Sequence, residues 1–193
     1  MTDGAARLAA RYPQVWHVIE AEGAGPWLTE TGLLPAAALQ AGGANRDGFV
    51  RIALSGGGIA VLRPQRMPDR QLLPTLAGSF AGRPECWRQY VDQHVFFWVE
   101  ARRRDAFARA CMRLRGGSVP SPVIVTFDTA ALLERHSAIA YFASFNTGST
   151  VRGGARVLRD ENTLRPVKEY SRGAIAELAI RGRVDTSWCL HSR

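Results

Sequence analysis

The chain has 193 residues, of which 46% are hydrophobic and 22% are charged. This length and composition predict one folded domain spanning residues 1–193, because such a chain buries a core without a disulfide or a metal. Twenty-five basic residues against seventeen acidic ones leave a net charge of +8, and Lys168 is the only lysine. The positive surplus favours a polyanionic partner, such as nucleic acid, or a phosphate-bearing ligand. The choice of Arg over Lys is explained equally well by a GC-rich coding sequence.

Several classes of protein are excluded by simple patterns. No apolar stretch reaches the ~18 residues that span a bilayer, and the first eleven residues lack the apolar centre of a secretory signal. The three cysteines are odd in number and form no CxxC pair, which argues against a disulfide framework or a structural zinc site. The four histidines are too far apart in sequence to form a metal signature. We therefore expect a cytoplasmic protein that needs no metal.

The N-terminal half predicts strands separated by short helices. A β-branched and aromatic run, VWHVI, is typical of a strand. Two short helices should follow, the first ended by Gly32 and the second begun by Pro35. Two β-rich runs around a glycine turn predict a hairpin. The expected bounds are 15–19 for the strand, 25–32 and 35–41 for the helices, and 50–54 and 59–62 for the hairpin.

The C-terminal half continues with strands and short helices. Helices are expected at 72–76, 85–92, 101–113 and 129–136, and strands at 94–99, 123–127 and 174–180. Asp128 is a suitable N-cap for the helix at 129–136. In the helix at 101–113, the apolar residues Phe107, Ala110, Cys111 and Leu114 share one face, and the arginines lie mostly outside it. The strands do not alternate regularly with helices, so we predict an α+β fold.

Common nucleotide-binding and hydrolase motifs are missing. Ser55-Gly56-Gly57-Gly58 follows a strand, but it lacks the lysine of a P-loop and the spacing of a dinucleotide-binding loop. It also leads into another strand, so no helix N-terminus is available to hold phosphate. A hairpin turn is therefore the favoured interpretation. No GxSxG motif is present.

Glu177 and His17 are the polar residues whose positions need explanation. Glu177 lies in the apolar run 174–180, where a carboxylate is costly unless it is paired, hydrogen-bonded or facing a cleft. Alternatively, the run is an edge strand with Glu177 on its solvent face. His17 lies inside the first strand, where it is either a core residue or a ligand-binding one. Arg63 and Arg66 follow a hairpin strand and can reach the mouth of a cleft.

Taken together, these segments resemble the ADP-ribosyltransferase fold, most closely the DarT-type enzymes that modify DNA. That family opens with an aromatic residue, His and apolar residues, followed by a helix and Gly-Leu. The matching residues in this chain are Trp16-His17-Val18-Ile19 and Thr31-Gly32-Leu33-Leu34. Its central aromatic strand resembles Val95-Phe96-Phe97-Trp98, and its closing Ala-Glu resembles Ala176-Glu177-Leu178-Ala179-Ile180. The likeness touches about half of the chain. It implies an α+β fold with split mixed or antiparallel sheets and short flanking helices.

Two other likenesses leave the activity open. RNA 2′-phosphotransferases share this fold and the opening motif. A family of small bacterial proteins of unassigned function is similar in its Phe-Phe-Trp and Asn-Thr-Gly segments. The alternatives are therefore an RNA 2′-phosphotransferase-like enzyme or a catalytically inactive module of the same fold that binds nucleic acid or protein.

The resemblance implies a role for each candidate residue around the substrate NAD. Glu177 matches the family's catalytic glutamate, which stabilises the oxocarbenium-like ribose and can deprotonate the acceptor. His17 matches the histidine that contacts the NAD ribose. An arginine normally holds the NAD phosphates or orients the reaction, and Arg63 is the first candidate. Further contacts to NAD are expected from Arg51, Arg66, Asn146 and Thr147.

The resemblance also implies an acceptor and partners. The loop before the glutamate reads the acceptor in this fold, which here is segment 165–172. Lys168 and Arg172 would contact phosphates, and Tyr170 would stack on a base. A merely solvated basic loop is the alternative. The expected acceptor is nucleic acid, DNA rather than RNA, and a bacterial toxin of this kind would have an antitoxin protein as its partner.

Overall fold

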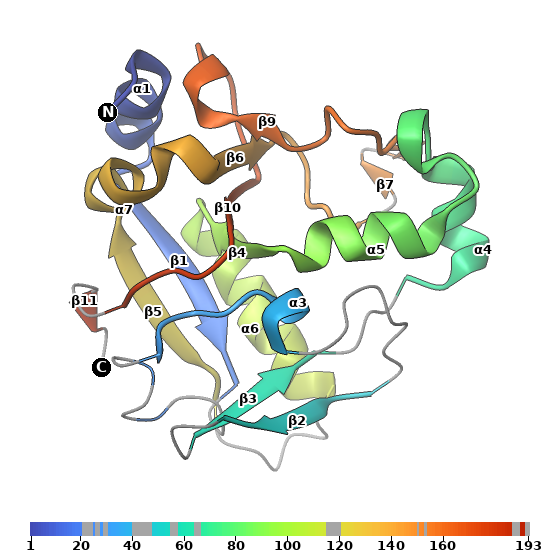
Figure 1. Ribbon diagram of the computed structural model, residues 1–193, viewed down its shortest axis with the longest axis horizontal. Coiled ribbons are helices and arrows are strands. Elements are labelled where there is room, and N and C mark those ends of the chain that lie inside the picture. Colours follow the sequence, from blue (N-terminus) through green and yellow to red (C-terminus); the bar gives the residue numbers. More distant parts are fainter. Residues whose placement is uncertain are drawn as a thin grey trace.

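A seven-stranded antiparallel sheet runs through the centre of the molecule, and helices lie against both of its faces (Figure 1). The structure is a computed structural model and describes residues 1–20, 25, 28, 31–39, 48–54, 58–63, 67–114, 121–149, 151–152, 154–186 and 190–191. Within these ranges the chain combines helices with antiparallel strands, which confirms the predicted α+β class.

The strands of the sheet, in spatial order, are β11 (Leu190–His191), β5 (Val123–Asp128), β1 (Gln14–Ile19), β4 (His94–Trp98), β10 (Glu177–Arg181), β6 (Ala140–Ala143) and β9 (Arg165–Pro166). Two hairpins stand apart from it, β2 (Val50–Ala53) with β3 (Ile59–Leu62), and β7 (Val151–Arg152) with β8 (Ala155–Arg156). The helices are α1 (Asp3–Arg11), α3 (Ala36–Leu39), α4 (Asp69–Leu72), α5 (Pro84–Asp92), α6 (Ala101–Leu114) and α7 (Thr129–His136). Short 3-10 turns are η2 (Leu73–Thr75), η3 (Gly78–Phe80), η4 (Ser137–Ile139) and η5 (Val167–Glu169).

Most predicted elements are present close to their expected bounds. The strands predicted at 15–19, 94–99 and 123–127 are β1, β4 and β5, and the predicted hairpin is β2–β3. The helices predicted at 35–41, 85–92, 101–113 and 129–136 are α3, α5, α6 and α7. The Asp128 carboxylate caps α7 as predicted, because it accepts a hydrogen bond from the Ala131 amide at 2.8 Å. The turn residues 55–57 and half of the helix predicted at 25–32 lie outside the described residues.

Two predicted elements have different bounds. The helix predicted at 72–76 begins earlier, as α4, and passes into the turn η2 because Pro74 has no amide hydrogen for an α-helical bond. The strand predicted at 174–180 begins only at Glu177. Gly173 turns the chain with a φ of 103°, and the Ile175 amide donates to the Tyr12 hydroxyl at 3.0 Å instead of to a neighbouring strand.

Strand β10 is central, which decides between the two interpretations of Glu177. It pairs with β4 on one side and with β6 on the other. The edge-strand alternative is therefore wrong. The Glu177 residue is only 5% exposed.

The two faces of the sheet are covered by different helices. On one face, buried side chains of β1, β4, β5 and β10 meet α1 and α7 in the main hydrophobic core. The other face carries α6, whose Phe107 ring lies 5.2 Å from the Trp98 ring, and α5, whose Tyr90 packs with Phe96. Successive residues of a strand point to opposite faces, and Glu177 pairs directly with Trp98. Glu177 therefore lies on the face of α5 and α6.

The sheet opens between β1 and β4. Strand β1 pairs with β5 over six residues, and β4 pairs with β10 over five, but β1 and β4 share one pair, Trp16 with Trp98. Beyond that pair the two parts of the sheet separate. A row of directly opposed residues, Trp16, Trp98, Glu177 and Ala143, crosses the sheet where the opening begins.

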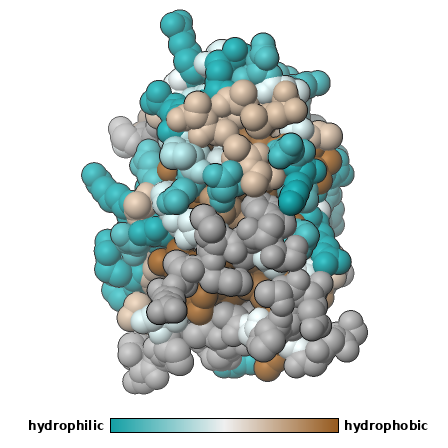
Figure 2. All heavy atoms as spheres, turned by 90° about the vertical axis from the view of Figure 1, so that its left-hand side faces the viewer, coloured by the Kyte–Doolittle hydropathy of each residue, from teal (hydrophilic) through white to brown (hydrophobic). Residues whose placement is uncertain are grey.

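The surface is mainly polar where it can be seen around α1, α7 and β5. Figure 2 shows this face with hydrophilic atoms around its upper rim and sides and a band of weakly hydrophobic atoms across its upper part. None of the helices described by the structure is long and apolar enough to cross a bilayer.

Gly32 allows two distant segments to approach each other. Its φ is 73°, and a Cβ atom on it would lie 2.3 Å from the Val184 carbonyl oxygen. The next residue, Leu33, exchanges two backbone hydrogen bonds with Val184, at 2.8 and 2.9 Å. The Gly-Leu pair of the sequence motif therefore joins the segment after β1 to the segment that follows β10.

We predict that Gly32→Ala destabilises the protein more than Gly82→Ala. Gly82 has a similar φ of 71°, but a Cβ atom on it would have nothing within 4 Å. Both changes carry the cost of a left-handed residue, about 1–2 kcal/mol. Gly32→Ala adds a backbone clash of roughly another 1–3 kcal/mol. Equal losses of unfolding free energy for both variants, measured by urea denaturation, would contradict this account.

Candidate functional site

Two adjoining cavities lie beside the opening of the sheet. The first has a volume of about 370 Å³, and the second, between α5 and α6, has a volume of about 450 Å³. Five of the predicted site residues line the first cavity: His17, Arg63, Asn146, Thr147 and Glu177. The wall common to both cavities consists of Arg63, Phe96, Phe107, Asn146, Thr147 and Gly148.

Glu177 is held by the loop that follows β6. Its Oε2 atom accepts a hydrogen bond from the Thr147 amide at 3.0 Å and another from the Thr147 hydroxyl at 2.9 Å. Thr147 is itself buried. The sequence predicts a contact from Thr147 to NAD, but in this structure both of its donors hold the carboxylate.

Burial gives Glu177 an unusual pKa. Loss of hydration raises the pKa of Glu177 to about 7, although the two Thr147 hydrogen bonds and the charges of Arg103 and Arg159 oppose the rise. The carboxyl group therefore changes its charge near neutral pH. A group of this kind in a cavity can take up or release a proton during a reaction.

Arg159 supports Thr147 through the Thr147 backbone carbonyl, and no sequence motif indicates it. It is fully buried. Its guanidinium donates to the Thr147 carbonyl at 3.4 Å, to the Val157 carbonyl at 2.7 Å and to the Ser149 carbonyl. It also lies over the Phe145 ring, 5.6 Å from its centroid. In sequence it is one of twenty-four arginines, and no local pattern distinguishes it.

His17 stands in the opening between β1 and β4. Its Nδ1 atom lies 2.8 Å from the Phe96 carbonyl oxygen. A carbonyl only accepts, so Nδ1 carries the proton and Nε2 is left as an acceptor on a ring that lines the first cavity. Burial lowers the pKa of His17 to about 4, with a further contribution from the charge of Arg63. The imidazole is therefore neutral at physiological pH.

Arg63 is the cation between the two cavities. Its Nε atom donates to the Glu20 carboxylate at 2.8 Å, and its Nη2 atom donates to the Val18 carbonyl at 2.5 Å. Its guanidinium also lies 4.9 Å from the centroid of the Phe107 ring. Arg63 is thus fixed at the end of β1, with a buried carboxylate as counter-ion.

The remaining candidates for NAD contacts differ in position. Asn146 lines both cavities, and its Oδ1 accepts from the Gly148 amide at 2.7 Å in the turn that carries Thr147. Arg51 is exposed on β2 and is not among the residues that line either cavity, so its contact to NAD stays a prediction. Arg66 lies outside the described residues.

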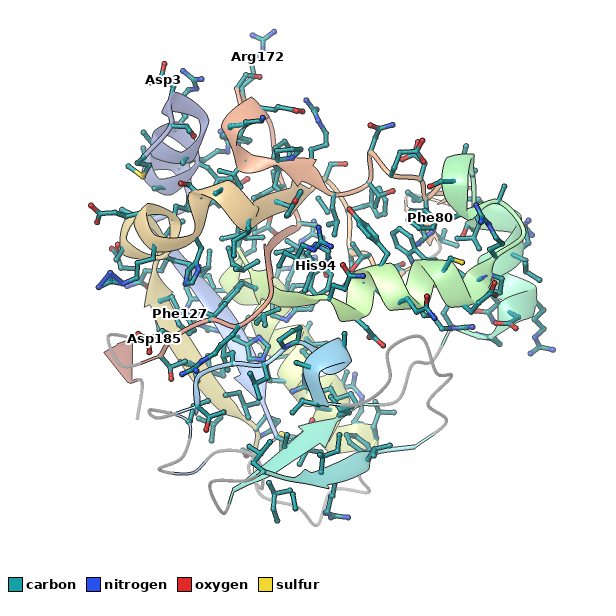
Figure 3. The ribbon with its side chains drawn as sticks, in the orientation of Figure 1. Asp3, Phe80, His94, Phe127, Arg172 and Asp185 are labelled. Carbon is teal, nitrogen blue, oxygen red and sulfur yellow. The ribbon has the colours of Figure 1, made fainter. Side chains whose placement is uncertain are left out.

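Segment 165–172 does not border the cavities, contrary to its expected role at the site. Tyr170 is 2% exposed, and its hydroxyl donates to the Gly173 carbonyl at 2.8 Å. The prediction that its ring stacks on a base is therefore wrong. Lys168 and Arg172 are exposed but line neither cavity, and Figure 3 shows Arg172 pointing away from the molecule at the end where Asp3 lies. The segment instead packs against α1.

The described residues contain no group of three or more His, Cys, Asp or Glu side chains that could hold a metal ion.

The apolar face predicted on α6 does not enter the main core. Phe107, Ala110, Cys111 and Leu114 line the second cavity.

Comparison with known proteins gives one family. The model of a family of unknown function, DUF7002, matches residues 13–187. No curated protein and no solved structure matches the chain. The matched range includes every candidate site residue named above.

We predict that Glu177→Gln stabilises the protein at pH 8 but much less at pH 5. The pKa of Glu177 is about 7 when folded and near 4.5 when unfolded. Its contribution to stability is therefore complete below pH 4.5 and declines as the pH rises through 7. Glutamine avoids the buried charge, for a gain of about 3 kcal/mol at pH 8. Urea denaturation at both pH values measures the unfolding free energy of the variant and of the natural chain. A difference between the two that is the same at pH 5 and pH 8 would contradict the prediction.

We predict that Arg159→Met destabilises the protein and raises the pKa of Glu177. The change leaves buried carbonyls without their donor, at a cost of at least about 3 kcal/mol. It also frees Thr147 to move away from the carboxylate. Arg156→Met is the matched control, because Arg156 is exposed and three residues away. Urea denaturation measures the loss of stability, and a carboxyl titration by NMR measures the pKa of Glu177. If both variants lost similar amounts of unfolding free energy, Arg159 would not be the residue that holds Thr147 in place.

Proposed function

We propose that this chain, which belongs to the DUF7002 family, is an NAD-dependent ADP-ribosyltransferase that acts on nucleic acid. We further propose that its α+β fold is of the ADP-ribosyltransferase type. The opening of the antiparallel sheet at the Trp16–Trp98 pair supports this, because it brings the strand bearing His17 and the strand bearing Glu177 to one cavity.

The observation that carries the proposal is the buried Glu177 carboxyl group in that cavity. Transfer from NAD breaks the bond between ribose C1′ and the nicotinamide nitrogen, which takes the electron pair and leaves as neutral nicotinamide. The ribose then carries positive charge that a nearby carboxylate stabilises. The acceptor atom bonds to C1′, and its proton passes to the carboxylate. A group with a pKa of about 7 suits both tasks near neutral pH.

His17 offers a complementary contact. Its Nδ1 proton is committed to the Phe96 carbonyl, so a ligand in the cavity meets Nε2 as a hydrogen-bond acceptor. Ribose hydroxyl groups are donors of the required kind. This fits the proposed substrate, since each half of NAD carries a ribose.

The two cavities fit a ligand with two halves. NAD consists of two nucleosides joined by a pyrophosphate, and Arg63 belongs to the wall between the cavities. Its guanidinium is fixed there by Glu20 and Val18. We propose that its positive charge faces the pyrophosphate and that aromatic residues of the cavities receive the bases. The net charge of +8 supports a polyanionic acceptor.

The decisive experiment follows the transfer of label from NAD. The protein is incubated with adenylate-labelled NAD and with single-stranded DNA or RNA, and both nicotinamide release and labelled nucleic acid are measured. We expect transfer by the natural chain and a loss of at least about 100-fold in Glu177→Gln. Glu169→Gln is the control, because Glu169 is exposed and lies on η5. It should keep full activity.

The same experiment separates the other interpretations. Full activity in Glu177→Gln, or no NAD binding by the natural chain at millimolar concentration, contradicts the proposal. Consumption of NAD only when the RNA carries a 2′-phosphate identifies an RNA 2′-phosphotransferase. Salt-sensitive binding of nucleic acid with no NAD consumption identifies an inactive binding module.

A further inference from the structure

The second cavity is a slot between two helix faces. Helix α5 leads into β4, and α6 follows β4 in the chain (Figure 1). On α5, the residues Arg88, Val91 and Asp92 line the cavity, and their spacing of three and four residues places them on one side of the helix. The apolar face of α6 and Phe96 of β4 line the same cavity. Its volume of about 450 Å³ lies in the range of small-molecule sites, roughly 300–1,000 Å³.

The α5 side of this slot is held in place by contacts of its own. The Arg88 guanidinium donates to the Asp69 carboxylate and, at 3.3 Å, to the Met67 carbonyl. These bonds tie α5 to the segment that begins α4, and Met67 and Leu72 of that segment also line the cavity. The slot is therefore formed by the folded chain before a ligand enters it.

Asp92 stands at a costly position in this slot. It is the last residue of α5, where the carbonyl groups that end a helix disfavour a negative charge. It is also only 5% exposed, so its carboxylate has lost most of its hydration. A carboxylate has about four acceptor positions, so it can accept from a ligand as well as from the protein. A ligand in the slot therefore meets a hydrogen-bond acceptor beside apolar side chains.

Glu177 decides which half of NAD belongs in which cavity. The bond that breaks joins nicotinamide to its ribose, so this half has to lie beside the Glu177 carboxyl group, which lines the first cavity. Arg63, in the wall between the cavities, faces the pyrophosphate in the proposed function. The adenosine half then extends into the second cavity. Adenine has two fused rings and is the larger base, and the second cavity is the larger of the two.

We propose that the second cavity binds the adenosine half of NAD, with adenine between Val91 and Ala110 and with its 6-amino group donating to Asp92. Phe96 provides the aromatic contact. This inference rests on the proposed function, and it makes Asp92 the residue that selects the base. Hypoxanthine carries an oxygen in place of the amino group. That oxygen would face the carboxylate, and two acceptors with no proton between them repel each other.

The first test separates the two halves of NAD. Binding of AMP and of nicotinamide mononucleotide is measured by calorimetry. Ala110→Trp fills the second cavity, and Ala60→Leu narrows the first, which the buried Ala60 lines. Ala106→Trp is the control, because Ala106 is exposed on α6 and is not among the residues that line either cavity.

We expect Ala110→Trp to weaken the binding of AMP by at least about tenfold, because the indole takes the space of the adenine. It should change the affinity for nicotinamide mononucleotide by less than about twofold. Ala60→Leu should have the opposite pattern. The control variant should change neither affinity by more than about twofold.

The second test measures the selection of the base. The natural chain should bind NAD at least about tenfold more tightly than its hypoxanthine analogue. Asp92→Asn should bring this ratio to about one, because an asparagine amide accepts from an amino group and donates to an oxygen. Glu85→Gln removes an exposed carboxylate from the same helix and should leave the ratio unchanged. A purely structural role of Asp92 would change both affinities by the same factor.

Several results would overturn the inference. These are a loss of nicotinamide mononucleotide rather than AMP in Ala110→Trp, an equal response of both fragments to each cavity variant, or a full preference for NAD in Asp92→Asn. If one of the two variants Ala110→Trp and Asp92→Asn fails to fold, the test that uses the other still decides.

The outcomes also separate this inference from the proposed function. Binding of AMP that Ala110→Trp abolishes, without any consumption of NAD by the natural chain, contradicts only the proposed enzyme. Unchanged consumption of NAD by Ala110→Trp at low NAD concentration contradicts only this inference. Failure of the natural chain to bind NAD and AMP overturns both.

Discussion

The two hydrogen bonds from Thr147 to Glu177 are the constraint around which the site is built. A carboxyl group inside a sheet is tolerated only if donors replace the water that it has lost. These donors come from a loop thirty residues earlier in the chain. The loop has to be rigid to supply them, and the buried Arg159 holds it through backbone carbonyls. Glu177, Thr147 and Arg159 therefore form one structural unit, in which a change at any member reaches the other two.

The opening of the sheet is the second constraint, and it concerns His17. With continuous pairing, backbone amides of β1 would occupy the carbonyls of β4. Because pairing stops at Trp16 and Trp98, the Phe96 carbonyl instead receives the His17 ring. The same separation creates space for the first cavity. The sheet thus loses backbone hydrogen bonds in its centre, and in return it has a fixed imidazole tautomer and space for a ligand. Functional sites often carry a local structural cost of this kind.

The sequence was informative where the signals were local. The aromatic and β-branched runs and the Asp128 cap each act over a few residues, and the structure confirms them. Glu177 could be singled out because an acidic residue in an apolar run is unusual. Arg159 could not, because its carbonyl partners are brought to it by folding. The role of segment 165–172 was predicted wrongly because its local composition is misleading. Its composition suits a basic loop, but Tyr170 is buried by packing against Phe142, a contact that no local pattern contains.

The arginines show why net charge alone does not identify a binding surface. Arg159 is buried against carbonyls, Arg63 is held by Glu20, and Arg104 lies over an indole ring. Each is part of the protein's own structure before any ligand is considered. A cation contributes to recognition of a polyanion only to the extent that its charge reaches solvent. By that criterion, exposed arginines such as Arg102, Arg109 and Arg113 on α6 count towards recognition of a polyanion, and the total of +8 overstates the charge that a partner meets.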